Sequence, residues 1–330
     1  MTENFDRMVV ADPLAAFEKQ GMLKLVSPSK VNLFLGIGAL RKDGYHEVNT
    51  VMHTLNLHDV IHMDYFPESA GGLHIELSCY AREGLTSLNI EPEDNLVTKA
   101  IRLLAHKLGR DCDETFRIRA EKHIPFEAGL GGGSSNAAAA LVGAAKFWGI
   151  EAPAKALSAK ACAPEILETA AEIGSDVSFF LYGGCAHMSG AGERFEKLLA
   201  PMKSPVVLVK PEGGVSTAAA YQLFDKDPLL IPENLAHEVA RMSCAQDVPL
   251  FNNLAAAAET LLPELTKIRL WLEEQAGTKG VLLCGSGATT IAFCENFDAA
   301  CKISAAAQSQ GWWARTTTLC SYGVLSTEPK

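Results

Sequence analysis

The alternation of apolar and polar residues predicts β-strands in both halves of the chain. Around Val31, apolar side chains occupy every second position within 24–40, which is typical of a strand with one buried face. We interpret 24–40 as two strand-like pieces, and the extended backbone places Lys30 and Asn32 on the same face. Further strands are predicted over 51–64, 115–120, 206–210, 281–284, 290–294 and 312–319, with a small glycine-rich strand pair within 183–193.

Apolar residues spaced three or four positions apart predict the helices. Residues 91–108 show this spacing after an entry through Pro92, and an alanine-rich run over 137–148 follows a group of glycines. Helices are also predicted over 153–160, 164–173, 216–224, 254–275 and 297–310. Because strands and helices alternate along the chain, we expect an α+β fold.

A change in sequence character predicts where one domain ends and the next begins. Polar, proline-containing sequence at 201–205 precedes a new apolar strand. We therefore predict one domain over 22–202 and a second over 203–330. An N-terminal extension over 1–21, with a short helical piece near 14–19, carries no motif.

Composition excludes several classes of partner. With a net charge of −10, the chain is not expected to bind nucleic acid or an anionic membrane, because neither attracts an acidic protein that lacks a basic patch. The nine cysteines are scattered without metal-ligand spacing, which favours a reducing compartment. The N-terminus shows no secretory signal, and no apolar run approaches the roughly 18 residues of a membrane span. We expect a soluble, cytoplasmic protein.

Five histidines lie close together in the sequence and raise the question of a metal site. They are His46, His53, His58, His62 and His74. Imidazole is the commonest metal ligand in proteins. However, His58 and His62 share a face only loosely in an extended segment, and no cysteine or glutamate completes a ligand set at suitable spacing. We therefore do not predict a metal site here.

The stretch 125–136 is the strongest functional signal from the residues themselves. It reads Pro-Phe-Glu-Ala-Gly-Leu-Gly-Gly-Gly-Ser-Ser-Asn. Glycines allow a ligand to approach the backbone closely, and Ser134, Ser135 and Asn136 are good N-cap residues for the following helix. The start of a helix exposes unpaired N–H groups, which bind phosphate well. We interpret this stretch as a phosphate-binding loop, the alternative being a flexible turn before a core helix.

The spacing of the glycines excludes the two commonest phosphate loops. A Walker loop requires a lysine after its last glycine, and no lysine follows Gly133. A dinucleotide-binding loop requires Gly-x-Gly-x-x-Gly directly after a strand, whereas the glycines here follow Gly129-x-Gly131-x-Gly133. In addition, Pro125 brings the chain to the glycines through an extended segment.

Asp176 lies at an element boundary, between Gly174 and the apolar run 177–181. Loops at such boundaries deliver catalytic groups. The alternative is an aspartate that caps the following helix or forms an Asx-turn.

Three motifs in one order carry a resemblance to a known family. They are Ser-Pro-Ser-Lys-Val-Asn-Leu at 27–33 with Asp-Gly-Tyr-His at 43–46, the glycine stretch at 125–136, and Cys-Gly-Ser-Gly-Ala at 284–288. With Gly-Ser-Asp-Val at 174–177 and Phe-Asn-Asn-Leu at 251–254, they resemble the GHMP kinases and, within that superfamily, the 4-diphosphocytidyl-2-C-methyl-D-erythritol kinase family. The resemblance spans about 24–320. Ser29 and Ser175 replace an alanine that is commoner in the family, which leaves the expected chemistry unchanged.

The resemblance implies a two-domain GHMP kinase fold. The N-terminal domain would be like domain 2 of ribosomal protein S5, the C-terminal domain would be ferredoxin-like, and the active site would lie in the cleft between them. The implied reaction is ATP-dependent phosphorylation of the 2-hydroxyl of 4-diphosphocytidyl-2-C-methyl-D-erythritol, a small-molecule substrate in the non-mevalonate isoprenoid pathway. Such a transfer depends mainly on positioning the acceptor and neutralising phosphate charge.

The resemblance also assigns roles to individual residues. Asp176 would accept the hydroxyl proton, and Lys30 would steady the developing charge beside it. The residues implied at ATP are Asn95 and Lys122 around the adenine, and Pro125, Gly129, Leu130, Gly131, Gly132, Gly133, Ser134, Ser135 and Asn136 at the phosphates. The residues implied at the acceptor are Asn32, Tyr45, His46, Thr217 and Tyr221. The third motif, Gly285, Ser286 and Gly287, would back the phosphate loop.

The expected cofactors are ATP and Mg²⁺. The metal ion would bridge phosphate oxygens, helped by the hydroxyl of Ser134 or Ser135, and we assign it no other protein ligand. Tyr45 and Tyr221 would offer aromatic faces to a cytosine ring, although either residue alone resembles an ordinary half-buried tyrosine.

Two rival functions stay open at this point. One is a GHMP kinase for another small acceptor, such as homoserine or mevalonate. The other is a catalytically silent nucleotide-binding sensor, which the presence of both Lys30 and Asp176 disfavours. A monomer and a homodimer are both compatible with the sequence.

Overall fold

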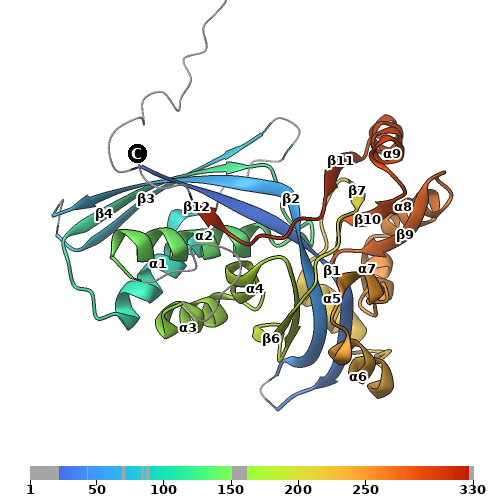
Figure 1. Cartoon of the computed structure of the whole chain (residues 1–330), viewed down its shortest axis with the longest axis horizontal. Coiled ribbons are helices and arrows are strands. Elements are labelled where there is room, and N and C mark those ends of the chain that lie inside the picture. Colours follow the sequence, from blue (N-terminus) through green and yellow to red (C-terminus); the bar gives the residue numbers. More distant parts are fainter. Residues whose placement is uncertain are drawn as a thin grey trace, which may run out of the picture.

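The computed structural model describes residues 22–42, 44–68, 71–82, 85, 90–150 and 162–326. The predicted extension 1–21 with its helical piece, the motif residue Asp43 and the helix predicted over 153–160 lie outside the described residues. The described chain forms two lobes, each built on its own β-sheet (Figure 1).

The sheet of the first lobe gathers strands from both ends of the chain. Its strands are β1 (Leu23–Leu40), β2 (His46–Pro67), β3 (Leu73–Ala81), β4 (Glu114–Lys122), β5 (Cys185–Ser189), β6 (Arg194–Leu199), and the short β8 (Phe251–Asn252) and β12 (Leu325–Ser326). Their order is β12-β1-β2-β4-β3, and β5 pairs with β2 and β6, while β8 pairs with β1. The pairs β3–β4 and β1–β8 are parallel, and the remaining pairs are antiparallel.

Helices cover one face of this sheet. They are α1 (Leu96–Lys107), α2 (Gly132–Phe147), α3 (Pro164–Ile173) and α4 (Val177–Tyr182), and the 3₁₀-helix η2 (Pro92–Asp94) precedes α1 (Figure 1). The alanine-rich α2 is buried along most of its length, because its small side chains let it lie close to β1 and β2. At Gly143, an added Cβ atom would lie 2.4 Å from Sδ of Met63. The composition of α2 thus sets how closely helix and sheet pack.

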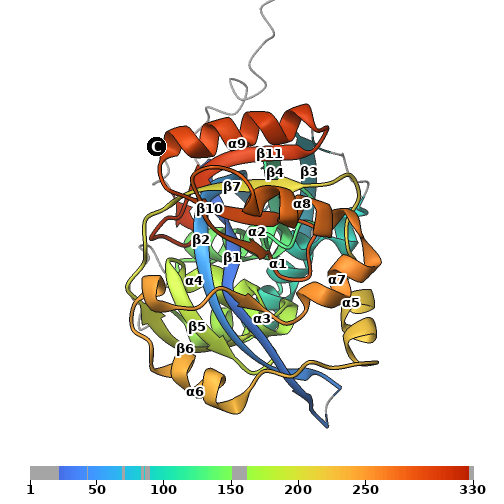
Figure 2. The same cartoon turned by 90° about the vertical axis from the view of Figure 1, so that its right-hand side faces the viewer.

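The second lobe is an antiparallel sheet with helices. Its strands are β7 (Pro205–Lys210), β9 (Thr278–Leu283), β10 (Thr290–Cys294) and β11 (Trp313–Thr318), in the order β11-β7-β10-β9. Its helices are α5 (Thr217–Phe224), α6 (Glu233–Arg241), α7 (Ala255–Leu261), α8 (Glu264–Glu273) and α9 (Phe297–Ser309), with the 3₁₀-helix η4 (Ala245–Asp247). Figure 2 shows α9 alongside β11. This strand order, fourth-first-third-second along the chain, is that of a ferredoxin-like domain.

One hydrophobic cluster joins the two lobes. It includes Val31 and Leu33 of β1 together with Val206 and Leu208 of β7. The second sheet begins at Pro205, close to the predicted boundary, whereas β8 and β12 from the predicted second domain complete the first sheet. The lobes are therefore held by a shared core and by strands that cross between them.

Several predicted elements differ in extent: β2 is longer than the predicted 51–64, α2 begins before 137, and β6 lies beyond 183–193. Two predictions also divide the chain wrongly. The segment 24–40 is a single strand, β1, whose register with β2 shifts after Pro28, Asn32 and Ile37, so bulges replace the predicted break. The helix predicted over 254–275 is two helices, α7 and α8, because Pro263 cannot continue a helix and becomes the N-cap of α8. The strands β3, β8 and β12 and the helix α6 were not predicted from the sequence.

In the part of the chain that is described, no helix is both long and apolar enough to cross a bilayer.

Candidate active site

A cavity of about 1320 Å³ brings the predicted site residues together. Every one of them lines it except Ser135. Its walls come from β1, β3, η2, the glycine stretch, the start of α4, α5 and the turn 285–287, so both lobes contribute.

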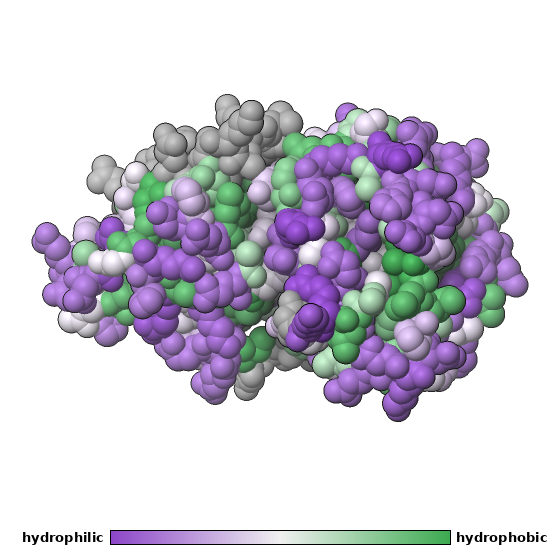
Figure 3. Space-filling model, turned by 90° about the horizontal axis from the view of Figure 1, so that it is seen from below, coloured by the Kyte–Doolittle hydropathy of each residue, from purple (hydrophilic) through white to green (hydrophobic). Residues whose placement is uncertain are grey.

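Seen from below, both lobes are largely hydrophilic, with a hydrophobic patch on the second lobe (Figure 3).

Residues 132–136 of the glycine stretch form the start of α2, and 125–131 lead into this helix as turns and irregular structure. The N-cap is Gly131, whose φ of 69° suits glycine, and the helix begins at Gly132. Ser134, Ser135 and Asn136 therefore lie inside the first turns, and the expectation that they are N-cap residues is wrong. Since the first N–H groups of a helix have no partner within it, those of this turn are available to an anion in the cavity.

The turn 285–287 of the second lobe packs directly against the glycine stretch. A Cβ atom added at Gly129, where φ is 71°, would lie 1.9 Å from the carbonyl oxygen of Cys284. Next to this contact, the N–H of Ala288 donates to the carbonyl of Glu127 at 3.0 Å, and the N–H of Thr289 donates to that of Ala128 at 3.1 Å. Backbone contact between the lobes thus fixes the position of the glycine stretch.

Lys30 and Asp176 meet at the floor of the cavity. Nζ of Lys30 lies 3.2 Å from Oδ2 of Asp176 and donates to Oδ1 of Asn32 at 2.7 Å. The Asn32 amide in turn donates to Oγ1 of Thr50 at 2.9 Å, which fixes its orientation. Lys30 is 4% exposed, whereas the Asp176 side chain is 32% exposed and open to the cavity. An ordered ammonium is therefore held beside an accessible carboxylate.

Asp176 occupies the N-cap position of α4, yet its side chain makes no capping hydrogen bond to the described residues. The carboxylate points to Lys30 instead of to the helix N–H groups. The capping role that we considered for Asp176 does not account for its side chain.

Among the residues predicted at the acceptor, Asn32 lies beside Lys30 in β1, whereas His46 belongs to β2 and Thr217 and Tyr221 belong to α5. The rings of His46 and Tyr221 have centroids 5.2 Å apart, and Nε2 of His46 lies 2.8 Å from Oδ1 of Asp225. Burial, with the carboxylates of Asp176 and Asp225 nearby, raises the pKa of Tyr221 to about 12. Tyr45 is 62% exposed at the rim. The site therefore has one half-buried and one exposed aromatic side chain.

Thr217 and Ser286 join the acceptor side to the third motif, because their hydroxyl oxygens lie 2.8 Å apart. At the opposite side of the cavity, the side chain of Asn95 caps α1 by accepting from the N–H of Val97 at 3.0 Å. The apolar residues Leu77, Ile90 and Leu96 also line the cavity. This end of the cavity suits a flat, largely apolar group such as a purine.

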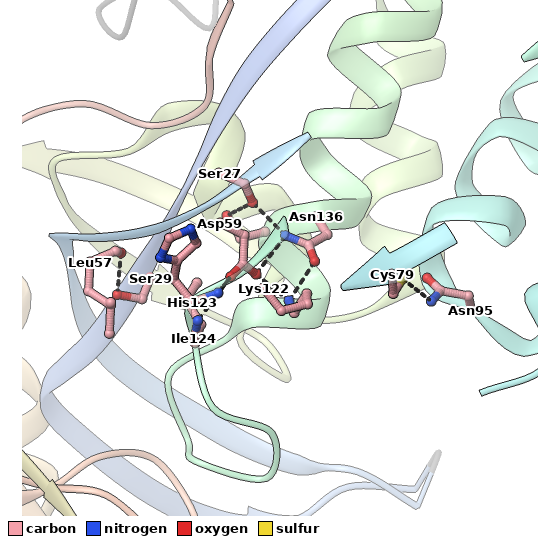
Figure 4. Close-up of polar contacts among 11 residues, drawn as sticks. Ser27, Ser29, Leu57, Asp59, Cys79, Asn95, Lys122, His123, Ile124 and Asn136 are labelled. Carbon is pink, nitrogen blue, oxygen red and sulfur yellow. Dashed lines mark hydrogen bonds and ion pairs between the residues drawn. The ribbon is translucent and has the colours of Figure 1, made fainter. Parts of the chain in front are cut away.

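Lys122 and Asn136 belong to a polar network that sequence reasoning missed (Figure 4). Nζ of Lys122 donates to Oδ1 of Asn136 at 2.6 Å and to the carboxylate of Asp59. The Asn136 amide donates to Asp59 at 3.0 Å and to the hydroxyl of Ser27 at 2.9 Å. The one available signal was an acidic residue, Asp59, inside the strand predicted over 51–64.

Of the two serines considered for Mg²⁺, only Ser134 lines the cavity. Ser135 is fully buried, and its hydroxyl accepts a hydrogen bond from Ser27 at 2.7 Å, so its proposed help to a metal ion is wrong. Among the described residues, no group of three or more histidine, cysteine, aspartate or glutamate side chains is arranged to hold a metal ion.

Two family descriptions match the chain. GHMP kinases N terminal domain matches residues 95–184, and GHMP kinases C terminal matches residues 233–311. Together they span both lobes.

Two curated proteins that are similar to this chain have the same name. A 4-diphosphocytidyl-2-C-methyl-D-erythritol kinase from Nocardia farcinica is 39% identical over 287 residues, which are 84% of this chain and 87% of that protein. A protein of the same name from Pelotomaculum thermopropionicum is 35% identical over 86% of this chain and 93% of its own length.

Solved structures agree with this similarity. A crystal structure of 4-(cytidine 5'-diphospho)-2C-methyl-D-erythritol kinase superposes with a TM-score of 0.68 at 30% identity, covering 90% of this chain and 98% of the other. A homoserine kinase from Cytophaga hutchinsonii superposes with a TM-score of 0.67 at 17% identity, over 93% of this chain and 98% of that one, and shares the fold.

Proposed function

The chain belongs to the 4-diphosphocytidyl-2-C-methyl-D-erythritol kinase family of the GHMP kinases, and we propose how its residues carry out this activity. It is an ATP-dependent small-molecule kinase. The reaction transfers the γ-phosphoryl group of ATP to the 2-hydroxyl of 4-diphosphocytidyl-2-C-methyl-D-erythritol, a precursor in isoprenoid biosynthesis. The rival acceptors, homoserine and mevalonate, are not supported by the similarities that show the family.

The observation that carries the proposed roles is the Lys30–Asp176 pair beside the first turn of α2. Asp176 accepts the proton of the acceptor hydroxyl, because its carboxylate is the partly exposed member of the pair. Lys30 keeps this carboxylate in place and stabilises negative charge that develops during transfer. Asn32 keeps the Lys30 ammonium oriented through its 2.7 Å hydrogen bond.

The glycine turn binds the phosphates of ATP. The backbone N–H groups of Gly132, Gly133 and Ser134 are the unpaired donors at the start of α2, and the helix dipole favours negative charge there. The third motif supports this turn through the contact between Gly129 and Cys284. The apolar end of the cavity near Asn95 receives the adenine.

Mg²⁺ fits this site although the protein supplies few ligands for it. The ion keeps several waters and is usually bound by phosphate oxygens with one or two protein oxygens. The Ser134 hydroxyl, at the cavity wall, is the residue that would hold it. When bound, the ion neutralises phosphate charge, whereas orientation of the acceptor and removal of its proton come from Lys30 and Asp176.

The acceptor binds on the side of His46 and Tyr221. The cytosine ring packs between the aromatic faces of Tyr221 and Tyr45, and the backbone of His46 meets its hydrogen-bonding edge, because the imidazole Nε2 is already paired with Asp225. ATP consumption measured with a panel of acceptors tests this proposal.

A further inference from the structure

The carboxylate of Asp59 is buried and surrounded by donors from two parts of the chain, the segment 122–124 and Asn136. Asp59 lies in β2 and is 0% exposed. Its Oδ1 accepts from the backbone N–H groups of His123 at 2.6 Å and Ile124 at 2.9 Å. Its Oδ2 accepts from Nδ2 of Asn136 at 3.0 Å and from Nζ of Lys122. These four donors satisfy the acceptor capacity of an ionised carboxylate.

The two carboxylate oxygens of Asp59 accept hydrogen bonds from different kinds of group, backbone at Oδ1 and side chains at Oδ2 (Figure 4). Oδ1 holds the backbone that leads from β4 toward the glycine turn. Ile124 on this segment is buried, and its Cγ2 lies 3.0 Å from where a Cβ of Gly132 would be. Oδ2 instead holds side chains. The same carboxylate therefore fixes both a backbone path and the Lys122 ammonium.

Lys122, which the resemblance placed around the adenine, reaches the cavity beside Gly132 at the first turn of α2. Its Nζ lies 3.5 Å from the position of a Cβ added at Gly132, and the residue lines the cavity. An ammonium has three N–H donors. Asp59 and Asn136 take two, and no other residue in the described part of the chain takes the third, which can therefore bind a molecule beside Gly132.

We propose that Asp59 is a positioning residue for the nucleotide, which acts by holding the Lys122 ammonium beside the first turn of α2. The inference rests on the proposed binding of ATP at that turn. Asp59 does not line the cavity, so it would act through Lys122 and not by direct contact with the ligand. Because a flexible lysine loses side-chain entropy when it binds, an ammonium ordered in advance binds phosphate more tightly than a free one.

Asp59→Asn separates the two functions of the carboxylate. The amide oxygen can still accept from the backbone at the Oδ1 position, but the amide nitrogen then faces Lys122 and Asn136, so donors meet donors. We expect the affinity for a nonhydrolysable ATP analogue, measured by calorimetry, to fall on the order of tenfold or more, as for loss of a charge-assisted hydrogen bond. The KM of the acceptor should stay within about twofold of wild type.

Glu114→Gln is the matched control. Glu114 is also a buried carboxylate of the first sheet, at 1% exposure, and it accepts from Tyr65, Arg110 and Trp148, but it does not line the cavity. Its variant should lower the unfolding temperature without changing affinity for the ATP analogue. If Asp59→Asn and Glu114→Gln weaken binding of the ATP analogue equally, Asp59 has a merely structural role and the proposal is overturned.

The double variant with Lys122→Met decides whether Asp59 acts through Lys122. If it does, the double variant binds the analogue as weakly as Lys122→Met alone. The proposal would be overturned if the losses of analogue affinity in the two single variants added up in the double variant. It would also be overturned if Lys122→Met bound the analogue as tightly as wild type. Should Asp59→Asn alone not fold, the double variant still decides, because it lacks the ammonium that faces the new amide. Since analogue binding needs no acceptor, wild-type binding without turnover would contradict the proposed substrate and leave this inference standing.

Discussion

Nζ of Lys30 lies 3.2 Å from Oδ2 of Asp176, and the two residues come from strand β1 and the start of α4. The lysine is almost fully buried, whereas the aspartate opens to the cavity. This asymmetry makes Asp176 the group that can reach an acceptor, with Lys30 behind it. The pair lies beside the first turn of α2, since a Cβ added at Gly131 would lie 3.0 Å from Cγ of Lys30.

Asp176→Asn should retain binding and lose turnover. The amide has nearly the shape of the carboxylate but does not act as a base, and loss of a positioned base costs on the order of 10²–10⁴ in rate. We expect kcat to fall by this amount while affinity for the ATP analogue stays close to that of wild type. Steady-state kinetics and calorimetry measure the two quantities.

Glu172→Gln provides the control for neutralising a nearby carboxylate. Glu172 is a surface residue of α3, paired with Lys107 and outside the cavity. Its kcat should equal that of wild type. Near-normal turnover in Asp176→Asn would remove Asp176 from the mechanism.

Gly132→Val should abolish tight binding of ATP. A Cβ at this position would lie 3.0 Å from Cγ2 of Ile124 and 3.5 Å from Nζ of Lys122, and the valine methyl groups would occupy the approach to the N–H groups of the turn. We expect affinity for the ATP analogue to fall on the order of tenfold or more. Gly71→Ala, where an added Cβ meets nothing within 4 Å, is the control and should bind like wild type. Retained affinity in Gly132→Val would contradict the assignment of the phosphate site.

Local sequence signals were sufficient for much of the fold. The helix predicted at 164–173 and the strand at 290–294 have the predicted bounds in the structure. The predictions failed where the backbone geometry of a residue overrides the hydrophobic periodicity, as at Pro263. They also failed where a strand pairs with a segment that is distant in the sequence. The two-residue strands β8 and β12 show no periodicity of their own and exist because β1 offers them an edge.

The site was predictable where residues form motifs and not where they meet only in space. The motif residues gather in one cavity, as expected for a shared ligand. Asp59 and Asp225 escaped prediction, because their partners lie far away in sequence. The burial of Ser135 likewise depends on Ser27, which no local pattern connects to it.

His53 should make the fold less stable as the pH falls. Its Nε2 accepts from the N–H of Met202 at 3.2 Å, so the neutral ring donates from Nδ1 to the carbonyl of Thr54 at 3.0 Å. Burial lowers the pKa of His53 from 6.5 to about 4. Because the folded state disfavours the proton, this contribution to stability is complete above pH 6.5 and is lost progressively toward pH 4.

His53→Gln tests this dependence, since glutamine keeps polar groups but does not titrate in this range. Thermal unfolding followed between about pH 7 and pH 4.5 should show a smaller fall in Tm for the variant than for wild type. If the Tm of the variant and that of wild type fell equally with pH, His53 would not contribute to the pH dependence of stability. Buried His187 also has a lowered pKa, so the variant retains part of the slope.

Tyr221→Ala should weaken binding of the acceptor and spare ATP. Stacking of a base on an aromatic ring contributes roughly 1–3 kcal/mol, so the KM of the acceptor should rise about tenfold. Tyr221→Phe keeps the ring face and should behave like wild type. If Tyr221→Ala and Tyr221→Phe have equal acceptor KM values, the ring face does not bind the base. Tyr45→Ala should give the same pattern at the exposed rim.

The most direct test of the assigned function is ATP consumption with a panel of acceptors. The panel contains 4-diphosphocytidyl-2-C-methyl-D-erythritol, its base-free phosphate, mevalonate, homoserine and galactose. A site built to hydrogen-bond a base rejects analogues that lack it, because its buried polar groups are then left unpaired. We predict turnover of the cytidine-containing substrate alone. Turnover of mevalonate or homoserine in its place would contradict the assigned substrate.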